Sequence, residues 1–420
     1  MNADATHPAA AAVPIWRDTA AWMKTSDLMA VLLAFSVPWS TSFVAIFAVL
    51  FVLSLLPTFD AAAFVRSAKR PASILPVALF VLAVAGTLWA SDTPWTSRFN
   101  GINPVAKLLM IPLLIYHVER SARGMWIVLS FFASCCVVLV VSWIIFYAGI
   151  VTSYWEGVPV KNYIAQSQEF ALCAFAAAGA AMFLYRQGRA PLASALIALA
   201  ILFIANMIFV ISSRTVLVCL PVLLALFAWR FFGKASLMWA LIVAVVVAAF
   251  AWLASPGLRE RVNNVSLEYK RYVATNDVNS TAMRLEFWRK SMSFVERAPL
   301  VGHGTGSTKT LFERDAVGKT GVSSEVIGNP HNQTLSVAVQ WGLIGVAVLY
   351  AMWIAHAAMF TGVGLAAWIG LVAVVENFVS SIFNSHLFDF TEGWVYVLAV
   401  GVAAGLVCRE NKKSFETSAS

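Results

Sequence analysis

Charge is scarce in this chain, and its scarcity excludes most soluble architectures. Of the 420 residues, only 12% are Asp, Glu, Lys or Arg, while 60% are hydrophobic. Soluble domains carry roughly 25% charged residues, so lipid rather than water must be the main solvent of this chain. The period-two alternation of a membrane β-barrel is also lacking. The composition therefore predicts an all-α polytopic membrane protein.

The cysteines and the net charge exclude two further classes of site. All five cysteines lie in apolar segments or at their ends, and none has the spacing of metal ligands. They are Cys135, Cys136, Cys173, Cys219 and Cys408. The net charge of +8 invites a nucleic-acid partner, but the basic residues sit in short loops between apolar runs. We therefore expect membrane lipids as partners, and no nucleic acid.

Apolar runs that match the thickness of a bilayer recur along the chain. A spanning helix needs about 20 apolar residues. Twelve spans are predicted, near residues 27–40, 42–57, 72–90, 103–117, 125–149, 168–185, 192–211, 215–230, 236–254, 333–351, 362–384 and 393–408. The first two divide at Pro38-Trp39-Ser40-Thr41. A single helix over residues 192–230 would measure about 58 Å against a hydrocarbon core of about 30 Å, so the chain must turn at Ser212-Ser213-Arg214-Thr215.

The distribution of Lys and Arg predicts the orientation. An even number of spans places both termini on one side, where fourteen basic residues lie: Arg17, Lys24, Arg66, Lys69, Arg70, Arg120, Arg123, Arg186, Arg189, Arg230, Lys234, Arg409, Lys412 and Lys413. The opposite short loops hold Arg98, Lys161 and Arg214, with Lys107 just inside a span. Basic short loops face the cytoplasm. We therefore expect cytoplasmic termini in a bacterial inner membrane, and residues 1–21 as a cytoplasmic tail rather than a signal peptide.

One polar window, residues 255–330, interrupts the apolar pattern and falls on the outer, periplasmic side. The expected organisation is nine transmembrane helices in 1–254, a periplasmic loop domain in 255–330, three helices in 331–408 and a cytoplasmic tail in 409–420. Within the window, residues 258–274 are a predicted helix. Thr281 is expected to cap another helix over residues 282–297, which Pro299 terminates.

Among the six histidines, His331 has the most suggestive position. The predicted orientation leaves His7, His117 and His356 on the cytoplasmic side, His386 ends a span, and His303 sits between glycines. His331 instead joins the polar window to the next span, behind Pro330. Such a histidine is either satisfied by neighbouring backbone or acts as a general base near neutral pH. The positive end of a helix disfavours the imidazolium, which helps to keep such a base neutral.

Two arginines on the same side are candidate anion ligands. Arg214 sits in the outer turn between two spans, as an interfacial anchor or as a bidentate phosphate clamp. Arg284 lies in the first turn of a predicted helix, where free N–H groups favour an anion; the alternative is a solvated surface arginine. Trp288, four residues on, is placed to brace Arg284. If this pair is not the clamp, Arg98, Lys107 and Arg289 are the substitutes.

The remaining polar residues support other chemistries less well. The run from Gly302 to Gly306 is either a backbone anion cradle or a tight turn, and it lacks the features of a nucleotide-binding loop. Asp92 stands alone in its outer loop, which disfavours metal catalysis. Glu376, inside a predicted span, is the best argument for a transporter, because acids within the membrane mark ion paths.

Three motifs, in this order, resemble the O-antigen ligase and polymerase superfamily of bacterial envelopes. The first is Ser212-Ser213-Arg214 between two spans. The second is Arg284-Leu-Glu-Phe-Trp288 followed by Pro299-Leu-Val-Gly-His-Gly-Thr-Gly306. The third is Pro330-His331-Asn332 leading into Trp341-Gly342-Leu343-Ile344-Gly345. The resemblance is specific over residues 212–345 and architectural elsewhere.

This resemblance implies an O-antigen ligase, a membrane glycosyltransferase without metal or cofactor. The donor would be a glycan on undecaprenyl pyrophosphate and the acceptor a sugar of lipid A–core. Transfer would take place at the periplasmic face and would invert the anomeric centre. His331 would activate the acceptor hydroxyl, Arg214 and Arg284 would hold the pyrophosphate, and Asn332 and Trp288 would support them. An O-antigen polymerase and a protein-directed oligosaccharide ligase remain open, as does a lipid or polysaccharide transporter.

Overall fold

The computed structural model describes residues 18–152, 157–211, 213–236 and 280–419, with a few scattered residues between 238 and 267. The regular elements in this part of the chain are helices, as the composition predicted. They are α1 (Thr19–Ser36), α2 (Thr41–Leu55), η2 (Leu56–Thr58), α3 (Ala61–Ala68), α4 (Pro71–Ala85), α5 (Trp95–Ala106), η3 (Lys107–Leu109), α6 (Met110–Arg120), α7 (Gly124–Tyr147), α8 (Tyr163–Arg186), α9 (Ala190–Phe209), α10 (Arg214–Phe232), α13 (Ser280–Arg297), α14 (Ser307–Ala316), η4 (Gly321–Ser324), α15 (Gln333–Met359), α16 (Leu365–Ser380) and α17 (Phe390–Ala419).

Eight helices in the described residues are long and apolar enough to cross a membrane, or nine if α3 and α4, which meet at a bend of 86°, count as one broken span. The eight coincide with eight of the predicted spans. Helix α1, which overlaps the first predicted span, falls outside this group. Helix α16, with 16 residues, is apolar but shorter than the eight candidate spans. The predicted span 236–254 lies largely outside the described residues. The chain is thus a multi-pass membrane protein with eight or nine candidate spans in its described part.

The turns that separate the predicted spans are confirmed where the structure describes them. Helix α1 ends at Ser36, and the hydroxyl of Ser40 accepts a hydrogen bond from the N–H of Phe43 to cap α2. Helix α9 ends at Phe209 and α10 begins at Arg214. One helix over both segments would be longer than the hydrocarbon core of the bilayer, so the chain turns between Phe209 and Arg214.

One predicted boundary is wrong: the fourth span in the chain begins well before residue 103. Helix α5 starts at Trp95 and continues through η3 into α6, so Trp95–Arg120 forms one apolar unit. Arg98, which made this stretch look like an outer loop, is buried, and its guanidinium donates to the carbonyls of Thr93 and Thr87, each at 2.8 Å. The charge is thus satisfied by backbone dipoles inside the protein rather than by water.

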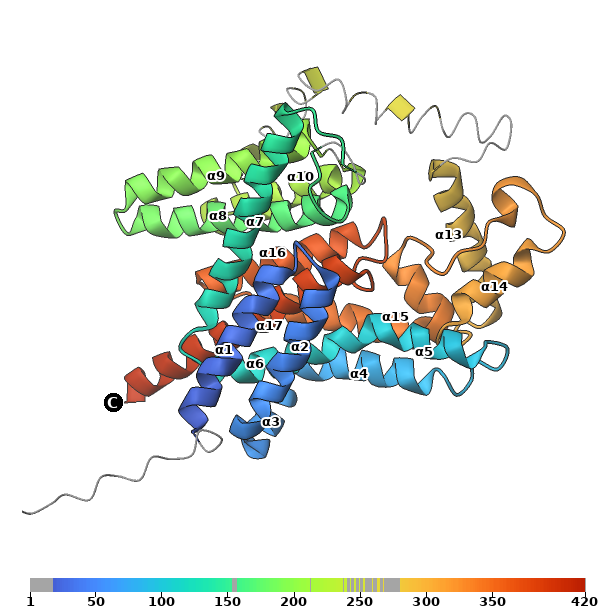
Figure 1. Ribbon diagram of the computed structural model, residues 1–420, viewed down its shortest axis with the longest axis horizontal. Helices are drawn as coiled ribbons and strands as arrows, with labels where there is room; N and C mark the ends of the chain where they lie inside the picture. Colours follow the sequence, from blue (N-terminus) through green and yellow to red (C-terminus); the bar gives the residue numbers. More distant parts are fainter. Residues whose placement is uncertain are drawn as a thin grey trace, which may run out of the picture.

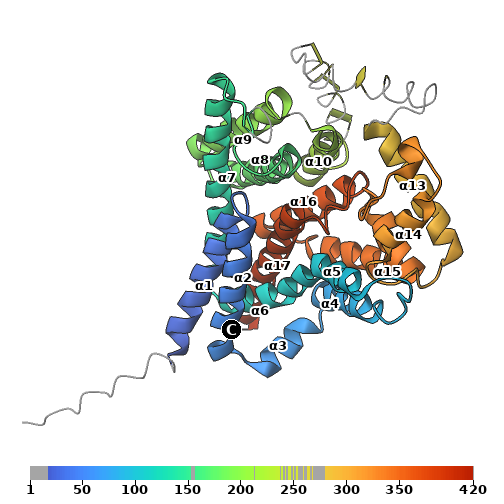
Figure 2. The ribbon, with the colours of Figure 1, turned by 45° about the vertical axis from the view of Figure 1, so that its right-hand side comes forward.

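The ends of the described chain lie opposite the polar window. Figures 1 and 2 show the start of α1 and the end of α17 at one end of the molecule, with α13 and α14 at the other. Basic loops predicted to share a side meet there: Arg70 bonds to Glu119 at 2.7 Å and to the sulfur of Cys408 at 3.1 Å. The predicted tail 409–420 is not a separate segment, because α17 continues as a helix to Ala419.

Residues 280–330 of the polar window form a small helical unit that packs on α15. Phe287 and Phe294 of α13 form edge-to-face contacts with Phe312 of α14, and Val339 of α15 completes this cluster. The buried Lys290 bonds to Asp315 at 3.0 Å and ties α13 to α14. The predicted helix 282–297 is confirmed within two residues at its start, although Thr281 lies inside the helix. The predicted helix 258–274 falls outside the described residues.

The segment Pro299–Gly306 is a strap that joins the window to a kink in α15. Gly342 breaks the helical geometry of α15 with φ of 60°, and the freed amides of Leu343 and Ile344 donate to the carbonyls of Pro299 and Leu300 at 2.8 and 3.2 Å. A Cβ on Gly302 would lie 2.5 Å from the backbone of α15, so only glycine permits this contact. The run Pro299–Gly306 and the run around Gly342, which belong to two of the motifs quoted above, are thus in direct contact.

The amides of the strap are used by the protein rather than offered to an anion. His303 and Gly304 donate to the carbonyls of Val339 and Gln340, and Thr305 donates to Gly86. The N–H of Gly306 donates to the side-chain oxygen of Gln340 at 2.8 Å. Of the two interpretations of this glycine-rich run, the tight turn is therefore the one that the structure supports.

Candidate functional site

His331 occupies a strained position immediately before α15. Its φ of 54° lies in the left-handed region, which is uncommon for residues other than glycine. The side-chain oxygen of Asn329 holds this conformation by accepting a hydrogen bond from the N–H of His331 at 2.9 Å. The same oxygen accepts from the hydroxyl of Ser385 at 2.7 Å. The backbone of His331 is thus fastened to the loop between α16 and α17, and local strain of this kind concentrates at functional sites.

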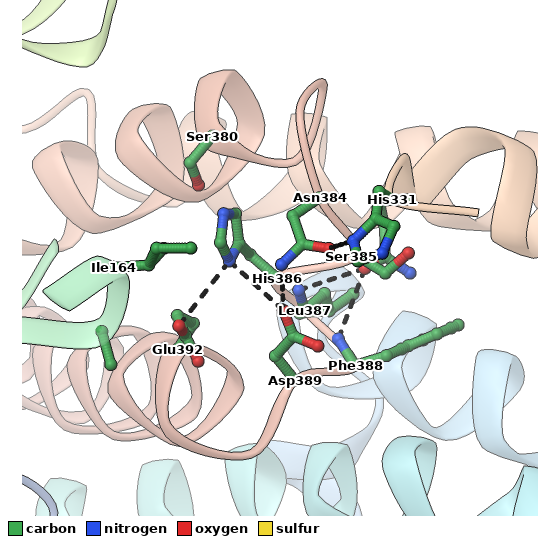
Figure 3. Close-up of polar contacts among 12 residues, drawn as sticks. Ile164, His331, Ser380, Asn384, Ser385, His386, Leu387, Phe388, Asp389 and Glu392 are labelled. Atoms are coloured by element: carbon green, nitrogen blue, oxygen red, sulfur yellow. Dashed lines mark hydrogen bonds and ion pairs between the residues drawn. The ribbon is translucent and has the colours of Figure 1, made fainter. Parts of the chain in front are cut away.

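The imidazole of His331 is oriented by a short chain of side chains from that same loop. Its Nδ1 lies 2.8 Å from Oδ1 of Asn384, and Nδ2 of Asn384 donates to Oδ2 of Asp389 at 2.7 Å (Figure 3). Because the carboxylate of Asp389 can only accept when ionised, the amide must present its oxygen to the ring. Nδ1 of His331 therefore carries the proton, and Nε2 is the nitrogen with the lone pair.

Helix α13 packs on the other face of this histidine. The ring of Phe287 stacks on the imidazole with an interplanar angle of 26°, and Nε1 of Trp288 donates to the carbonyl of His331 at 3.3 Å. The brace of Arg284 by Trp288 stays a prediction, and the structure ties Trp288 to His331. Arg284 lies one helical turn before Trp288 and is half-buried. Because Phe287 and Trp288 contact His331, the helix that carries Arg284 is anchored directly to the histidine.

Arg214 is the first residue of α10, at the outer turn where the sequence placed it. Its side chain and Ser212 lie outside the described residues. Helix α10 packs against α16, the helix that leads into the loop with Asn384 and Asp389. The structure therefore links Arg284 to His331 through α13, and links the backbone at Arg214 to the same region through α16.

The three substitute cations considered from the sequence all have structural partners. Arg98 caps backbone carbonyls, as described above. Lys107 donates to the carbonyls of Phe388 and Asp389. Nε and Nη2 of Arg289 donate to the carboxylate of Glu286 at 2.8 and 2.7 Å. This contact lowers the pKa of Glu286 below its usual range. The protein itself thus engages all three of these cations.

Asn332 has a structural role that explains its place beside His331. Its Oδ1 caps α15 by accepting from the N–H of Leu335 at 2.9 Å, and its Nδ2 donates to the carbonyl of Ile382 at 2.9 Å. Gln333 adds two contacts to the same loop, since its side-chain oxygen accepts from the amides of Leu387 and Phe388. The start of α15 and the 381–389 loop therefore move as one piece.

One group in the described residues has the ligand types and spacing for a metal ion: His386, Asp389 and Glu392, whose ligand atoms lie within 4.8 Å of one another. The His386 ring is fully buried, with Nδ1 at 3.4 Å from Asp389 and 3.9 Å from Glu392 (Figure 3). The ammonium of Lys107 also reaches this place through the carbonyl of Asp389. A resident cation thus already offsets these carboxylates.

The other described histidines are held by partners away from this loop. Nε2 of His303 lies 2.8 Å from the carbonyl of Phe294, and Nε2 of His117 lies 2.8 Å from Asp27. His356 contacts the hydroxyl of Tyr396 at 2.6 Å. Their surroundings explain these three histidines as structural groups, which supports the choice of His331 made from the sequence.

The structure describes the surroundings of two carboxylates singled out from the sequence. Asp92 bonds to Arg314 of α14 at 2.9 Å, and this hydrogen bond lowers the pKa of Asp92. Glu376 is buried in α16, and its Oε1 has no hydrogen-bond partner within the described part of the chain. Glu376 therefore keeps its place as the observation that favours a transporter.

Sequence reasoning missed the residues that orient His331. Asn329, Asn384 and Asp389 belong to no recognisable motif, and two of them lie more than fifty residues beyond the histidine in the chain. The one available signal was the polar run Asn384-Ser385-His386 at the end of an apolar span, where polar side chains are costly unless they serve the protein.

Residues 198–350 match the family model described as O-antigen ligase. The matched segment runs from α9 into α15 and includes Arg214, Arg284 and His331. No curated protein matches the chain. The match supports the assignment of this chain to the O-antigen ligase family, as the three motifs predicted. Members of this family are membrane glycosyltransferase-like enzymes, and the family implies lipid-linked glycan substrates.

Proposed function

We propose that this chain is an O-antigen ligase that transfers a glycan from undecaprenyl pyrophosphate to a sugar hydroxyl of lipid A–core at the periplasmic face of the inner membrane. The observation that carries the proposal is the contact between His331 and Asn384. An imidazole whose Nδ1–H is held by an amide presents Nε2 as a proton acceptor, which is what a general base for a sugar hydroxyl requires.

The reaction balances with the side chains of this site. Nε2 of His331 takes the proton of the acceptor hydroxyl as its oxygen forms a bond to the anomeric carbon of the donor. The bond between that carbon and the pyrophosphate oxygen breaks, and undecaprenyl pyrophosphate leaves with the electron pair. Attack opposite to the leaving group inverts the anomeric centre.

Arg214 and Arg284 supply the charge that this departure needs. The leaving pyrophosphate gains negative charge in the transition state, and guanidinium groups bind phosphate oxygens in a bidentate fork. Charge stabilisation of this kind is commonly the largest single contribution to catalysis. Arg284 stands on the helix whose Phe287 and Trp288 contact His331, which supports its assignment to the same site.

The orientation is part of the proposal and has a direct test. Val317, in the connection after α14, is 80% exposed, and Phe415 near the end of α17 is 76% exposed. In spheroplasts, a membrane-impermeant maleimide is expected to label a Val317→Cys variant and to spare Phe415→Cys until the membrane is permeabilised. Labelling in the reverse order would place the window in the cytoplasm and contradict the proposed side of transfer.

Replacement of His331 tests the base. The purified protein in nanodiscs, given undecaprenyl-pyrophosphate-linked glycan and lipid A–core, is expected to produce capped lipopolysaccharide. His331→Gln is expected to lower the rate roughly 10²- to 10⁴-fold, the usual contribution of a general base. His303→Gln provides the matched control, because that ring contacts a backbone carbonyl instead. Equal rates for wild type and His331→Gln would refute the role of His331.

The product distinguishes the proposed ligase from its alternatives. Longer lipid-linked chains would identify a polymerase, and a glycosylated protein acceptor would identify a protein-directed ligase. Glu376, with its unsatisfied buried oxygen, favours the transporter alternative. Protein-dependent passage of labelled lipid-linked glycan across a vesicle membrane, without a covalent product and with loss in Glu376→Gln, would establish that alternative instead.

A further inference from the structure

A polar cavity of about 400 Å³ lies beside the loop that holds His331. Side chains from α5, α14, α15 and the 381–389 loop surround it, and they include Asn100, Thr308, Asn329, Gln340, Ser385 and Asp389. We propose that this cavity binds the sugar of the acceptor. The proposal rests on the proposed function and adds the place and the chemistry of the second substrate.

Two residues that line the cavity also help to position His331. Asn329 lines it and accepts from the N–H of His331 at 2.9 Å. Asp389 lines it and holds Asn384, whose oxygen contacts the imidazole. A ligand in this cavity therefore lies against two of the residues that set the position of His331.

The lining matches a neutral sugar. Half of the residues that line it carry amides or hydroxyls, and such groups pair with sugar hydroxyls as donors and acceptors at once. The hydroxyl of Thr308 is buried, with 3% of the residue exposed, and its Oγ1 has no hydrogen-bond partner in the described part of the chain. A buried polar atom without a partner is costly.

The same lining is a poor match for pyrophosphate. Among the described residues that surround the cavity, Lys309 is the one cationic side chain, and it is exposed and 3.7 Å from Glu313. The carboxylate of Asp389 adds negative charge. Arg284 is not part of this lining. The donor pyrophosphate and the acceptor sugar are thus assigned to different surroundings of His331.

The cavity continues toward the membrane in an apolar groove. A second cavity of about 580 Å³, lined largely by α2, α5 and the start of α17, shares Asn100, Pro104 and Phe388 with the first. Val49 and Leu53 of α2 line this groove and are more than half exposed. A sugar carried by a lipid can therefore approach from the side of α2 without leaving the bilayer.

Filling the cavity tests the proposal. Gly328 lines it, and a Cβ at this position meets no described atom within 4 Å, so Gly328→Phe places a ring in free space. We expect at least a tenfold weaker binding of lipid A–core to the protein in nanodiscs, with unchanged binding of undecaprenyl-pyrophosphate-linked glycan. Gly328→Ala is the size control, and Gly362→Phe, at the opposite end and equally unobstructed, is the matched control.

Asn100→Leu provides a second variant of nearly unchanged size, because Asn100 lines the cavity and is exposed. An amide with no role in binding predicts unchanged acceptor binding, whereas the proposal predicts a higher KM for lipid A–core and an unchanged KM for the donor. Normal acceptor binding in both Gly328→Phe and Asn100→Leu would overturn the assignment. Because binding is measured without turnover, a wild-type protein that binds lipid A–core in this cavity but transfers nothing would refute the proposed function and leave the cavity supported.

Discussion

The amide oxygen of Asn384 lies 2.8 Å from Nδ1 of His331, and this contact decides which ring nitrogen is available. The amide is itself fixed by Asp389, 2.7 Å from Nδ2 of Asn384. An amide accepts the Nδ1–H and orients the imidazole without placing a negative charge next to the ring. A carboxylate in its place would orient the ring equally well but would favour the protonated form.

Substitution of Asn384 separates orientation from charge. Asn384→Leu removes the acceptor at nearly constant size, so we expect kcat to fall roughly 10- to 100-fold, the usual cost of losing a partner that orients a reacting side chain. The exchange of Asn384→Asp with Asp389→Asn restores the acceptor and brings the negative charge next to the ring, whereas Asn384→Asp alone would set two carboxyl groups at hydrogen-bond distance. We expect the exchanged variant to recover activity at high pH and to move the acidic limb of the pH–rate profile to higher pH.

A merely structural role for Asn384 predicts a different result. Both substitutions would then lower the amount of folded protein and leave the pH–rate profile of the remaining enzyme in place. The measurement is the initial rate of lipid A–core glycosylation between pH 5 and pH 9, normalised to monodisperse protein. A profile for the exchanged variant, Asn384→Asp with Asp389→Asn, that superimposes on that of the wild type would contradict the role of this contact.

Loss of either arginine of the proposed clamp is expected to lower kcat without unfolding the protein. Arg214→Ala and Arg284→Ala each remove donors aimed at the leaving pyrophosphate, and the loss of one such donor costs roughly 10²- to 10³-fold in kcat. Arg230→Ala, at the other end of α10, and Arg297→Ala, exposed at the end of α13, are the matched controls. Full activity in both clamp variants would show that the pyrophosphate is held elsewhere.

The fold was predictable where the thickness of the bilayer sets the length of the apolar runs. Apolar runs of bilayer length gave eight of the candidate spans, and the length limit placed the turn before Arg214 correctly. The α5 boundary was missed because Arg98 satisfies its charge on the carbonyls of Thr93 and Thr87, a contact that composition does not show. The kink at Gly342 was likewise hidden, since it exists only because the Pro299–Gly306 strap bonds to α15 there.

The candidate site was predictable in part for a related reason. His331, Arg284 and Trp288 lie in motifs near one another in the chain, so their order alone suggested a common site. Asn384 and Asp389 reach His331 across an interval that spans two helices, and nothing local marks them. The indole of Trp288 bonds to the carbonyl of His331, a contact that its spacing from Arg284 did not indicate.

Removal of divalent metal is expected to leave transfer unchanged. The proposed reaction uses a neutral imidazole and two guanidinium groups, and the group His386, Asp389 and Glu392 already has the ammonium of Lys107 beside it. Transfer by the purified protein after dialysis against EDTA should therefore match that of the untreated protein. A loss that Mg²⁺, Mn²⁺ or Zn²⁺ restores, and that His386→Ala reproduces, would assign a functional metal to this group.

The stability of the α13 unit is expected to depend on pH through Glu286. Its carboxylate accepts two bonds from Arg289 and one from the hydroxyl of Ser323, and the Arg289 bond lowers its pKa in the folded protein. A carboxyl group with a lowered folded pKa stabilises the protein above its unfolded pKa, and this contribution is lost as the pH falls through the folded pKa. Discounted for the solvent around Arg289, the contribution is about 1 kcal/mol.

Glu286→Gln removes this titration and so isolates it. At pH 7 we expect the variant to unfold at a lower temperature than the wild type, and the difference should shrink steadily as the pH is lowered below about 4, the usual pKa of a glutamate. Thermal unfolding of both proteins in the same detergent from pH 3 to pH 7 measures the difference. A gap that stays constant over this range would mean that Glu286 stabilises α13 by packing alone.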